Sequence, residues 1–404
     1  MPASAFPDVS PETLRIDPLE RADTIPSSWY TDARIEPLER AAVFRPSWQV
    51  VGHVSQMPRA GDTLCATVAG EPIVVVRGAD DELRAFYNVC RHRGGPLVME
   101  HQDSCRVLQC KYHGWTYLLD GSLRGVPRFD RTELFDKEEN GLVPVTVDVW
   151  EGLVWVCTDA NAASWLAPTS GSLDATLGGI AERIAPQDLS GLQFHSRVTY
   201  DVACNWKTYV DNYLEGYHLP LVHPELCKTL DVSAYVTETF DRTSLQHSPI
   251  RQRDDGSVYG EGDAFYWFVF PNGMLNILPG RLQTNVILPN GPDRCTVMFD
   301  FFYDDVTSPE ALRQIDADLE FSERVQQEDI EICERVQLGL ASRGYDRGRF
   351  SVECEAGVHH FQALLKTAFS DALDQGIELA TGVDGLRPTP ARSSPSTSRF
   401  LNEP

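Results

Sequence analysis

Two pairs of metal-binding side chains lie close together in the first third of the sequence, in the segment NVCRHRGGPLVMEHQDSCRVLQCKYHGWTY. Cys90 and His92 form the first pair, and Cys110 and His113 form the second pair after seventeen intervening residues. Thiolate and imidazole groups are suitable ligands for iron–sulfur clusters and for zinc. Each pair offers one sulfur and one nitrogen donor, so the spacing predicts two short loops that face each other across a metal centre.

The order of Cys and His distinguishes between two kinds of centre. In a Rieske [2Fe–2S] centre two Cys bind one iron and two His bind the other, so each loop supplies one of each. Zinc sites with two Cys and two His usually pair like residues, as C-x2–4-C followed by H-x3–5-H. The segment therefore favours a Rieske cluster, with zinc as the alternative. Residues 93–96 are predicted to form a tight turn near the cluster and Trp115 to shield it, whereas His101 and Cys105 fit neither loop.

Short β-branched and aromatic runs surround this segment. The runs WQVVGHV, TLCATVA, PIVVVRG, LRAFYNVC, WTYLL and GLVWVC are separated by turn residues, as in a small all-β sandwich or barrel. We therefore predict an all-β domain over residues 48–158. Residues 1–47 are punctuated by Pro and contain short helical stretches such as PLERAAVF, so they are predicted to form an N-terminal arm.

The sequence that follows mixes strand and helix patterns. Residues 265–302 contain four long apolar runs, each spaced like an antiparallel strand. Strands followed by flanking helices indicate an α+β domain over residues 159–386, in which an antiparallel sheet grips a helix. The predicted helices cover residues 205–217, 308–340 and 358–373.

Composition and charge exclude several classes of protein. The chain has 59 acidic and 35 basic residues, and a net charge of −24 makes it a poor candidate for binding nucleic acid or an anionic membrane. No apolar run is long enough to span a membrane, and the N-terminal segment does not resemble a secretory signal. Ten Cys in 404 residues are too few for a disulfide scaffold, so a cytoplasmic location is predicted. The tail, residues 387–404, is rich in Pro, Ser and Thr and is predicted to be disordered.

A second candidate metal site lies in the segment NWKTYVDNYLEGYHLPLVHPEL. His218 and His223 are five residues apart, which on an unbroken helix would separate their rings by about 140°. A helix that ends near Tyr217, followed by a turn at Pro220, would bring both imidazoles to one metal. Non-haem Fe(II) oxygenases use two His and one carboxylate and leave positions open for O2. The segment therefore predicts such a site if a carboxylate lies nearby.

Asp329 is the candidate carboxylate. It falls within an apolar stripe of the predicted helix over residues 308–340, where an unpaired carboxylate would cost several kcal/mol and a metal ion would offset that cost. One alternative is Glu328, about 80° away from the stripe. Another is that an Asp on this stripe pairs with a buried Arg such as Arg281; Asp318 also faces the stripe, nearer the start of the helix. The stripe consists of Phe321, Val325, Ile332, Val336 and Leu340.

With these two motifs the chain resembles the large (α) subunits of Rieske non-haem iron ring-hydroxylating oxygenases, up to about residue 385. The resemblance rests on the C-x-H…C-x2-H set and on a carboxylate-x2-H-x4-H set. It implies a Rieske domain followed by a helix-grip (START/SRPBCC-like) catalytic domain, in a homotrimer built head to tail. In that family the electron passes from the cluster of one chain to the mononuclear iron of its neighbour.

The resemblance also implies a role for Glu215, three residues before His218. In the family a carboxylate at this position, usually Asp, bonds an iron-ligating His and, across the subunit boundary, a Rieske His that here is His113. Glu at this position resembles the members that act on quaternary ammonium compounds, the carnitine monooxygenases. The run LEFSERVQQEDIEICERVQLGLASRGYDRGRFSVECEAGVHHFQALL looks much like choline monooxygenase, and in that comparison Asp329 aligns with the iron carboxylate.

Together these features predict a terminal oxygenase that uses O2 and a small organic substrate at a mononuclear Fe(II) fed by the cluster. No G-x-G-x-x-G follows a strand, so NAD(P)H is expected to bind a separate flavin or iron–sulfur reductase. A quaternary ammonium substrate would need an aromatic cage, whereas an aromatic acid or arene would use the same residue types. The aromatic candidates are Trp206, Tyr209, Tyr213, Tyr217, Phe265, Tyr266, Trp267, Phe268 and Phe270.

Two other classes of function are weighed against the oxygenase. One is a Rieske electron-transfer protein without oxygenase activity, against which the His218, His223 and Asp329 set argues. The other is a zinc-stabilised binding module, which would be colourless, whereas a Rieske protein is brown-red. His359 and His360, at the start of the last predicted helix, are predicted to be structural.

Overall fold

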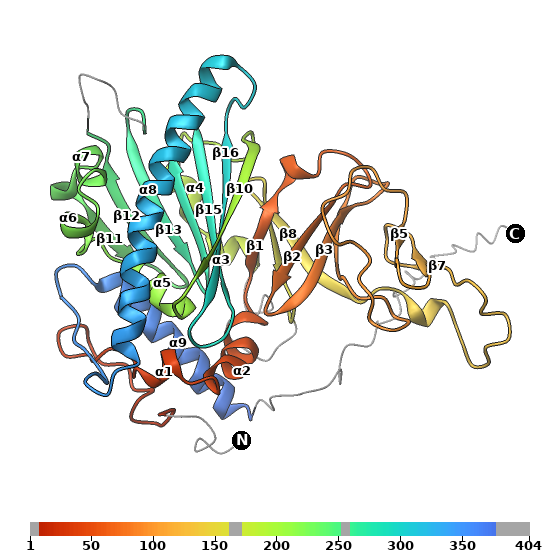
Figure 1. The fold of residues 1–404 in the computed structure, drawn as a ribbon, viewed down its shortest axis with the longest axis horizontal. Helices are drawn as coiled ribbons and strands as arrows, with labels where there is room; N and C mark the ends of the chain where they lie inside the picture. The colour runs from red at the N-terminus through yellow and green to blue at the C-terminus, as the bar shows by residue number, and fades with distance from the viewer. Residues whose placement is uncertain (1–7, 161–171, 252–258, 377–404) are drawn as a thin grey trace, which may run out of the picture.

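The computed structural model describes residues 8–160, 172–251 and 259–376. Two β-rich units lie side by side, and the N-terminal arm and the last helix lie below them in the view of Figure 1. The N-terminal unit, residues 48–160, contains the two Cys and His pairs, and the C-terminal unit, residues 172–376, contains the second candidate site. No helix within the described ranges is long and apolar enough to cross a membrane. The predicted tail, residues 387–404, lies outside the described residues.

Antiparallel strands build the N-terminal unit, as its β-branched runs predict. Six strands form one sheet in the order β1-β9-β8-β4-β3-β2, and three short strands form a second sheet in the order β5-β6-β7. The second Cys and His pair lies in the loop between β5 and β6. The strands are β1 (Gln49–His53), β2 (Thr63–Val68), β3 (Glu71–Arg77), β4 (Leu83–Tyr87), β5 (Leu108–Gln109), β6 (Thr116–Tyr117), β7 (Leu123–Gly125), β8 (Pro144–Trp150) and β9 (Leu153–Cys157), with the short helices η3 (Val54–Gln56) and η4 (Glu138–Asn140).

A seven-stranded antiparallel sheet forms the C-terminal unit, in the order β10-β16-β15-β14-β13-β12-β11. The long helix α8 (Pro309–Leu340) crosses one face of this sheet, and α9 (Ala356–Asp374) follows it (Figure 1). This arrangement confirms the predicted α+β class and the sheet that grips a helix. The strands are β10 (Gln193–Val202), β11 (Val236–Thr239), β12 (Thr243–Pro249), β13 (Asp263–Val269), β14 (Gly273–Leu278), β15 (Arg281–Pro289) and β16 (Cys295–Tyr303).

Short helices complete the two units. The arm forms a nearly continuous helical segment around the predicted PLERAAVF stretch, and helices of three to eight residues accompany the strands of the C-terminal unit. The helices are α1 (Ser28–Thr31), α2 (Ile35–Glu39), η2 (Arg40–Phe44), α3 (Leu173–Leu177), α4 (Ile180–Ile184), α5 (Trp206–Tyr213), α6 (Leu219–Val222), α7 (Leu226–Thr229) and η6 (Val232–Ala234).

The inner face of α8 is more polar than the sequence analysis predicted. Val336, which was assigned to an apolar stripe, is 44% exposed. The inner face carries polar side chains because part of it lines a cavity above the sheet and does not pack against a dry core. The buried residues of α8 are Ile315, Asp318, Phe321, Ser322, Gln326, Cys333 and Gln337.

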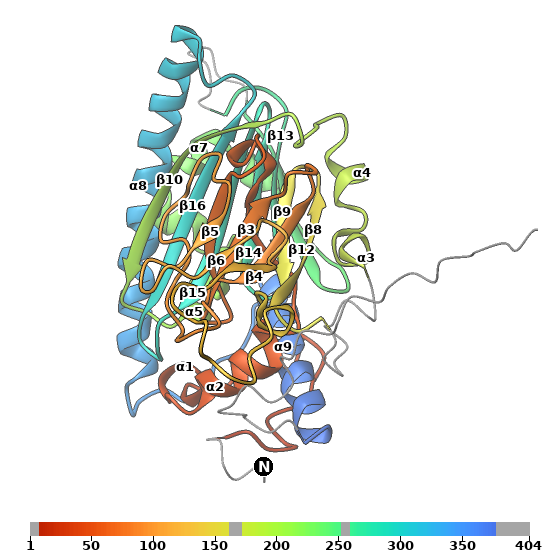
Figure 2. The same cartoon turned by 90° about the vertical axis from the view of Figure 1, so that its right-hand side faces the viewer.

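The large sheet separates the N-terminal unit from this cavity. Val50 of β1 and Trp155 of β9 share a buried apolar cluster with Trp267 of β13. Figure 2 shows the N-terminal strands in front of the large sheet. Successive side chains of a strand point to opposite faces, so Tyr266, next to Trp267, lines the cavity on the side of α8. The two Cys and His pairs and the second candidate site of one chain therefore belong to opposite sides of one sheet.

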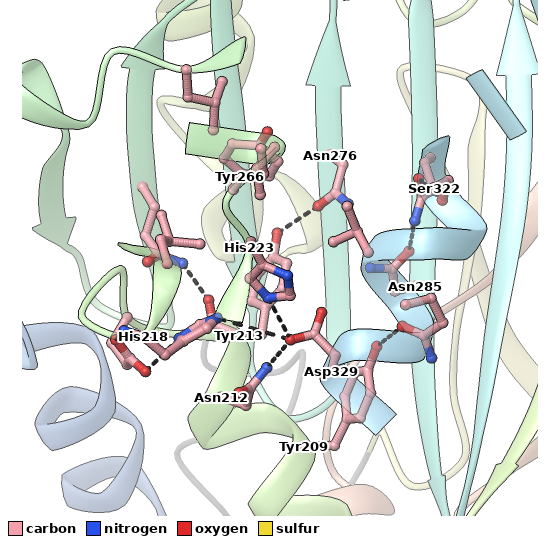
Figure 3. A pocket seen from close by; sticks show the side chains of 18 of the residues that line it. Tyr209, Asn212, Tyr213, His218, His223, Tyr266, Asn276, Asn285, Ser322 and Asp329 are labelled. Atoms are coloured by element: carbon pink, nitrogen blue, oxygen red, sulfur yellow. Dashed lines mark hydrogen bonds and ion pairs between the residues drawn. The ribbon is translucent and has the colours of Figure 1, made fainter. Parts of the chain in front are cut away.

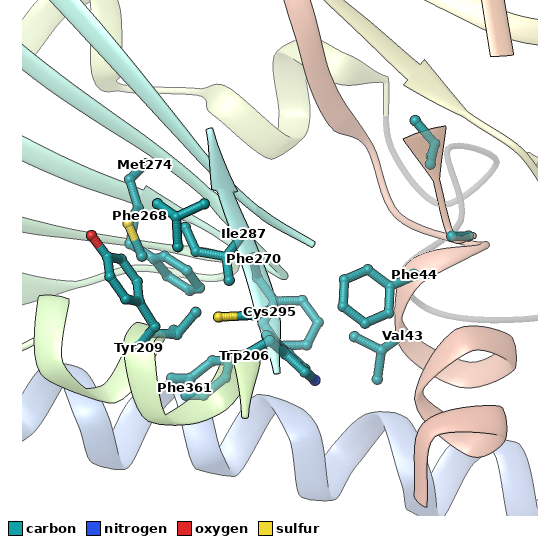
Figure 4. Close-up of a cluster of buried hydrophobic side chains, with 14 of the residues drawn as sticks. Val43, Phe44, Trp206, Tyr209, Phe268, Phe270, Met274, Ile287, Cys295 and Phe361 are labelled. Atoms are coloured by element: carbon teal, nitrogen blue, oxygen red, sulfur yellow. The ribbon is translucent and has the colours of Figure 1, made fainter. Parts of the chain in front are cut away.

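An apolar cluster fastens the arm to the C-terminal unit (Figure 4). Phe44 of η2 packs edge-on against Trp206 of α5 with ring centroids 5.0 Å apart, and Trp206 packs against Phe361 of α9 at 5.7 Å. Beside this cluster, the Glu39 carboxylate accepts a hydrogen bond from Trp206 Nε1 at 2.9 Å and pairs with the buried ammonium group of Lys207. The arm therefore stabilises α5, the helix that leads into the His218 segment.

Candidate metal centres

The two Cys and His loops have the same backbone structure. In each loop the Cys N–H donates to the carbonyl five residues later, and the N–H of a Gly four residues after the Cys donates back to the Cys carbonyl. This Gly has a positive φ in both loops, +71° and +75°, which a side chain would adopt only with strain. Backbone bonds therefore hold both Cys in position. The bonds are Cys90 N to Gly95 O (2.8 Å), Gly94 N to Cys90 O (3.0 Å), Cys110 N to Trp115 O (2.9 Å) and Gly114 N to Cys110 O (3.0 Å).

The side chains of these loops fit a cluster between them. The rings of His92 and His113 lie 4.7 Å apart, and the Cys90 thiol lies 3.4 Å from the Tyr117 hydroxyl. Nδ1 of His92 is buried without a hydrogen-bond partner in the described structure. A buried polar nitrogen without a partner is costly, and metal coordination removes that cost. Trp115 stacks on His92 at 4.9 Å with an interplanar angle of 6°, which is the shielding contact that the sequence predicts.

The spacing of the four side chains argues against zinc. A tetrahedral zinc ion with bonds of about 2.0–2.3 Å would bring all four ligand atoms within about 4 Å of one another. Among the described residues, the one group of three or more His, Cys, Asp and Glu whose ligand atoms lie within 4.8 Å of one another is elsewhere, at His218, His223 and Asp329. The four loop side chains are therefore more widely spaced, as a cluster of two irons between them requires.

His218 and His223 lie at the two ends of the single-turn helix α6. Helix α5 ends at Tyr213, four residues earlier than predicted, and the chain turns before it reaches His218. Pro220 sits in the first turn of α6, where its missing N–H costs no helical bond. Because the two His flank one turn and do not share one long helix, their rings approach to 5.1 Å between centroids.

Asp329 of α8 completes this group, which we call the His–His–Asp group (Figure 3). Its Oδ1 atom lies 3.0 Å from Nε2 of His223 and 3.8 Å from Nε2 of His218. The same oxygen accepts a hydrogen bond of 2.7 Å from Nδ2 of Asn212. The structure thus brings together the three side chains that the sequence analysis selected as iron ligands.

Each His of the group has a further carboxylate on its other ring nitrogen. Glu215 Oε1 lies 2.6 Å from Nδ1 of His218, and Glu328 Oε2 lies 2.7 Å from Nδ1 of His223. Glu328, the alternative ligand, therefore lies on the opposite side of the His223 ring from Asp329. From this position Glu328 can orient the His223 ring, but it cannot bind the metal that Asp329 would bind. Sequence analysis missed this role of Glu328, although its place next to Asp329 on the helix was a signal.

The sequence analysis offered one alternative to a metal ligand, namely an Asp of this helix that pairs with Arg281. The structure shows this pairing, but at Asp318 and not at Asp329. Arg281 of β15 pairs with Asp318 of α8, and the Tyr303 hydroxyl donates to the same carboxylate at 2.6 Å. Burial raises the pKa of Asp318, and the neighbouring guanidinium opposes that rise. Arg281 is therefore not the partner of Asp329, whose carboxylate faces the two His.

The negative charge of three carboxylates around the two imidazoles makes this site suitable for binding a cation. Burial opposes a charged His223, but its bonds to Asp329 and Glu328 outweigh burial and raise its pKa. A ferrous ion can take the place of that proton, because neutral imidazole and carboxylate are suitable ligands for it. Two His and one carboxylate would hold such an ion and leave coordination positions open for O2.

A cavity lies beside this group, between α8 and the large sheet (Figure 3). Tyrosines line one part of its wall, and carboxamides from α5, α8 and the strands line another part. No Lys or Arg is found among the described residues of the wall. The aromatic residues of the wall are Tyr209, Tyr213, Tyr235, Tyr259, Tyr266 and Phe299, and the carboxamides are Asn212, Gln246, Asn276, Gln283, Asn285 and Gln326.

The cavity wall matches the predicted aromatic candidates only in part. Tyr209, Tyr213 and Tyr266 line it, and Tyr217 is exposed. The other candidates belong to buried apolar clusters, namely Trp206, Phe265, Trp267, Phe268 and Phe270. The carboxamides were not predicted. Their signal was the presence of isolated polar residues in otherwise apolar strands, as in the run NILPGRLQTNVIL.

Six other His lie outside both centres, and four of them show how such residues serve the fold. His53 is buried against the Leu189 carbonyl at 3.3 Å, and burial lowers its pKa to about 4. His359 lies 2.9 Å from the Asp17 carbonyl, a contact that fastens the arm and agrees with a structural role. His101 contacts Asp103 at 3.1 Å, as expected of a loop residue, and His360 is partly buried in α9.

Comparisons with known proteins agree with the two units. The family model of the Rieske [2Fe-2S] domain matches residues 47–143, and that of the ring hydroxylating alpha subunit (catalytic domain) matches residues 189–370. The chloroplastic choline monooxygenase of Arabidopsis thaliana is 38% identical over 382 residues, which cover 89% of this chain and 87% of that protein. The chain belongs to the Rieske ring-hydroxylating oxygenase family. The carnitine monooxygenase oxygenase subunit of Escherichia coli (strain K12) is 34% identical over 378 residues, or 90% of this chain and 98% of that protein.

Solved structures show the same relationship. The quaternary ammonium Rieske monooxygenase CntA in complex with L-carnitine matches with a TM-score of 0.76 and 31% identity, over 86% of this chain and 96% of that chain. Naphthalene 1,2-dioxygenase with bound indole matches with a TM-score of 0.70 at 19% identity, over 88% of this chain and 94% of that chain, and shares the fold.

Membership of the family establishes the class of the protein. It is an oxygenase component that contains a Rieske [2Fe–2S] cluster and a mononuclear iron, and it works with a separate reductase that uses NAD(P)H. The predicted family, fold class, enzyme class and cofactors are confirmed. The zinc-stabilised module and the electron carrier without oxygenase activity are both disfavoured.

Proposed function

We propose that this Rieske oxygenase hydroxylates a quaternary ammonium compound at an iron held by His218, His223 and Asp329. The main evidence for this class of substrate is the composition of the cavity wall beside the His–His–Asp group. A quaternary ammonium group cannot donate a hydrogen bond, so aromatic faces and nearby negative charge recognise it. The cavity offers both, with no described basic side chain to repel a cation. Relatives named choline and carnitine monooxygenase support the same class.

The proposal assigns the cluster to the two loops of the N-terminal unit. Cys90 and Cys110 ligate one iron, and His92 and His113 ligate the other. The matching backbone structure of the loops, the unpartnered Nδ1 of His92 and the wide spacing of the four donors support this assignment.

The neighbouring side chains prepare the mononuclear site. When bound, the cluster supplies an electron and the ferrous ion activates O2. Glu215 and Glu328 accept the Nδ1–H of His218 and His223, which leaves each Nε2 free for the metal. Asn212 donates to Asp329 and keeps its carboxylate between the two rings. The tyrosine and carboxamide walls hold the substrate beside the iron and exclude bulk water.

We further propose a head-to-tail homotrimer in which Glu215 connects two chains. Within one chain the large sheet separates the cluster unit from the cavity, so a route between neighbouring chains is favoured. His113 is exposed, and the ring of Tyr112 beside it is 60% exposed. Glu215 accepts from His218 Nδ1 and from two backbone N–H groups, which leaves one of about four lone-pair sites for the partner subunit's His113. A solved quaternary ammonium Rieske monooxygenase is described in terms of inter-subunit electron transfer.

Cysteine chemistry supports a reducing, cytoplasmic setting as part of this proposal. None of the ten Cys forms a disulfide in the structure, and eight of them lie outside the proposed cluster. Free thiols persist where the compartment keeps them reduced.

Turnover of the reconstituted enzyme tests the proposed function. The oxygenase, a flavin reductase and NADH are incubated with choline, carnitine, benzoate and naphthalene, and O2 consumption is compared with product formation. We expect an ammonium substrate to give an oxidised product in proportion to the O2 consumed, and the arenes to give none. Hydroxylated arenes without any oxidised ammonium compound would contradict the proposal and establish the aromatic alternative.

A further inference from the structure

One carboxamide of the cavity wall differs from the others. Gln326 of α8 is only 2% exposed, and it lines the cavity one helical turn before Asp329. Its Oε1 accepts a hydrogen bond of 2.5 Å from the Tyr209 hydroxyl. Its Nε2 is buried and has no hydrogen-bond partner among the described residues. No other amide nitrogen of the described wall is buried without a partner. A buried N–H group without a partner is costly, so this nitrogen points to a ligand that the cavity is built to hold.

The Tyr209 contact determines what this ligand must offer. Because the Tyr209 O–H donates to Oε1, the NH2 group is the unused part of an amide whose side chain lines the cavity. An NH2 group can only donate, so the complementary atom is an acceptor such as a hydroxyl or carboxylate oxygen. A quaternary ammonium head has no hydrogen-bond acceptor, so Gln326 would bind a different part of the substrate.

Other carboxamides nearby are engaged with the protein itself. Gln283 donates to Asn285 Oδ1 at 2.8 Å and accepts from Arg281 Nη2 at 2.8 Å. Asn276 accepts from the Tyr213 hydroxyl at 2.8 Å. These bonds belong to the supporting wall, and among the amide nitrogens of the described wall only that of Gln326 is buried without a partner.

The surrounding charges favour a neutral acceptor over an anionic one. Residues three apart on a helix are neighbours, so the Gln326 amide lies next to the Asp329 carboxylate. With a ferrous ion bound, the three carboxylates around the group (Asp329, Glu215 and Glu328) still exceed the charge of the ion by one, so a substrate carboxylate bound to Gln326 would lie close to a net negative centre. No Lys or Arg of the described wall would compensate it, because Arg281 is engaged by Asp318 and Gln283. A hydroxyl oxygen accepts the same hydrogen bond without repulsion.

We propose that Gln326 is a specificity-determining residue that binds a neutral hydroxyl oxygen on the tail of the substrate, and that the enzyme prefers hydroxylated over carboxylated quaternary ammonium compounds. This inference rests on the proposed function, because it takes an ammonium head as given. The tyrosines hold the head, and the Gln326 amide holds the tail next to the iron ligand Asp329.

Three ammonium compounds with tails of matched size test this inference. They are 2-hydroxyethyltrimethylammonium, ethyltrimethylammonium and carboxymethyltrimethylammonium, and their dissociation constants are measured by calorimetry with the holoenzyme. For the wild type we expect the hydroxyethyl compound to bind about tenfold more tightly than the ethyl compound. The carboxymethyl compound should bind no more tightly than the ethyl compound. Tighter binding of the carboxymethyl compound than of the hydroxyethyl compound would overturn the inference.

The variant Gln326→Leu removes the donor and should abolish the preference. We expect the ratio of the hydroxyethyl and ethyl dissociation constants to approach one, while binding of the ethyl compound itself changes little. Gln337→Leu is the matched control, because Gln337 is a buried carboxamide on the same helix that contacts Asn205 outside the cavity. It should keep the wild-type ratio. An unchanged ratio in Gln326→Leu would overturn the inference.

A second variant keeps the test decisive if Gln326→Leu does not fold. Tyr209→Phe frees the amide to rotate and should reduce the hydroxyl preference in the same direction. A full preference in Tyr209→Phe would contradict the orienting role of this contact and overturn the inference. If none of the three compounds bound or turned over, the proposed function would fail. If the ethyl compound bound but Gln326 did not affect the ratio, only the present inference would fail.

Discussion

The cluster loops and the His–His–Asp group position their ligands by different means. The four loop side chains come from one short stretch, residues 90–113, and backbone hydrogen bonds hold both Cys. In the His–His–Asp group, His223 and Asp329 are 106 residues apart and come from α6 and α8. Each of its three members is held by the side chain of another residue. The first centre is therefore fixed by local backbone structure, and the second depends on tertiary packing and on side-chain partners.

This difference predicts how each centre responds to substitution. A change in a cluster ligand removes that centre completely, because the loop offers no substitute donor. Changes around the His–His–Asp group should be graded, since a ligand, an electron-transfer partner and a ring-orienting partner are separate residues. Four substitutions test this contrast.

The largest effect is expected for Cys110→Ser. Serine does not replace a thiolate as a cluster ligand, so the Rieske absorbance should be lost and product formation should fall to background. Cys105→Ser is the control, because Cys105 lies between the two pairs and bonds Gly61 through its backbone. A Cys110→Ser protein with its full visible spectrum would show that the ligand assignment is wrong.

Asp329→Ala should remove the mononuclear iron and leave the cluster intact. The remaining two His lack the carboxylate that completes the site, so turnover should fall to background while the Rieske spectrum is unchanged. Iron content and electron paramagnetic resonance of the reduced cluster measure the two centres separately. Glu331→Ala, at a side chain that is 65% exposed on the same helix, should change neither. Full iron content in Asp329→Ala would refute the proposed site.

Glu215→Gln should separate the filling of the metal sites from electron transfer between them. The amide keeps the shape of Glu215 but cannot accept from two ring N–H groups. We expect both centres to fill, the reductase to reduce the cluster, and product formation to fall by about a hundredfold. Glu225→Gln, an exposed substitution near α7, is the control. Wild-type turnover of the Glu215→Gln enzyme would make the proposed bridge dispensable.

Glu328→Gln should have the smallest effect of the four. Glu328 orients His223 but does not bind the metal in this account, so iron affinity should fall by only about tenfold. Competition with a chelator measures that affinity. A loss of iron as complete as that of Asp329→Ala would instead indicate that Glu328 is a ligand.

The sequence predicted best those features that depend on local spacing. Helices α8 and α9 and strands β13–β16 match the predicted ranges, because long periodic patterns identify them. The loop spacing was sufficient to propose the cluster residues, since both pairs and their turns lie in one segment within the matched Rieske domain. The helical-face argument selected Asp329 over Glu328, and the structure groups Asp329 with the two His.

Features that depend on tertiary packing were not predicted. Strand β10 alternates between exposed and partly exposed residues and carries no strong apolar signal. The stripe on α8 was assumed to face a dry core, so Val336 was placed inside although it is exposed. The roles of Glu328 and Gln326 follow from how α8 crosses the sheet and α5, which a single sequence does not specify.

Anomalous diffraction from crystals of the purified protein tests the central claim that one chain holds iron at both centres. Data collected on the two sides of the iron absorption edge locate iron directly, and data at the zinc edge provide the control. We predict one iron peak between the two loops, next to His92 and Cys110, and a second peak within bonding distance of His218, His223 and Asp329. A zinc signal between the loops, or an iron bound by Glu328 in place of Asp329, would contradict this account.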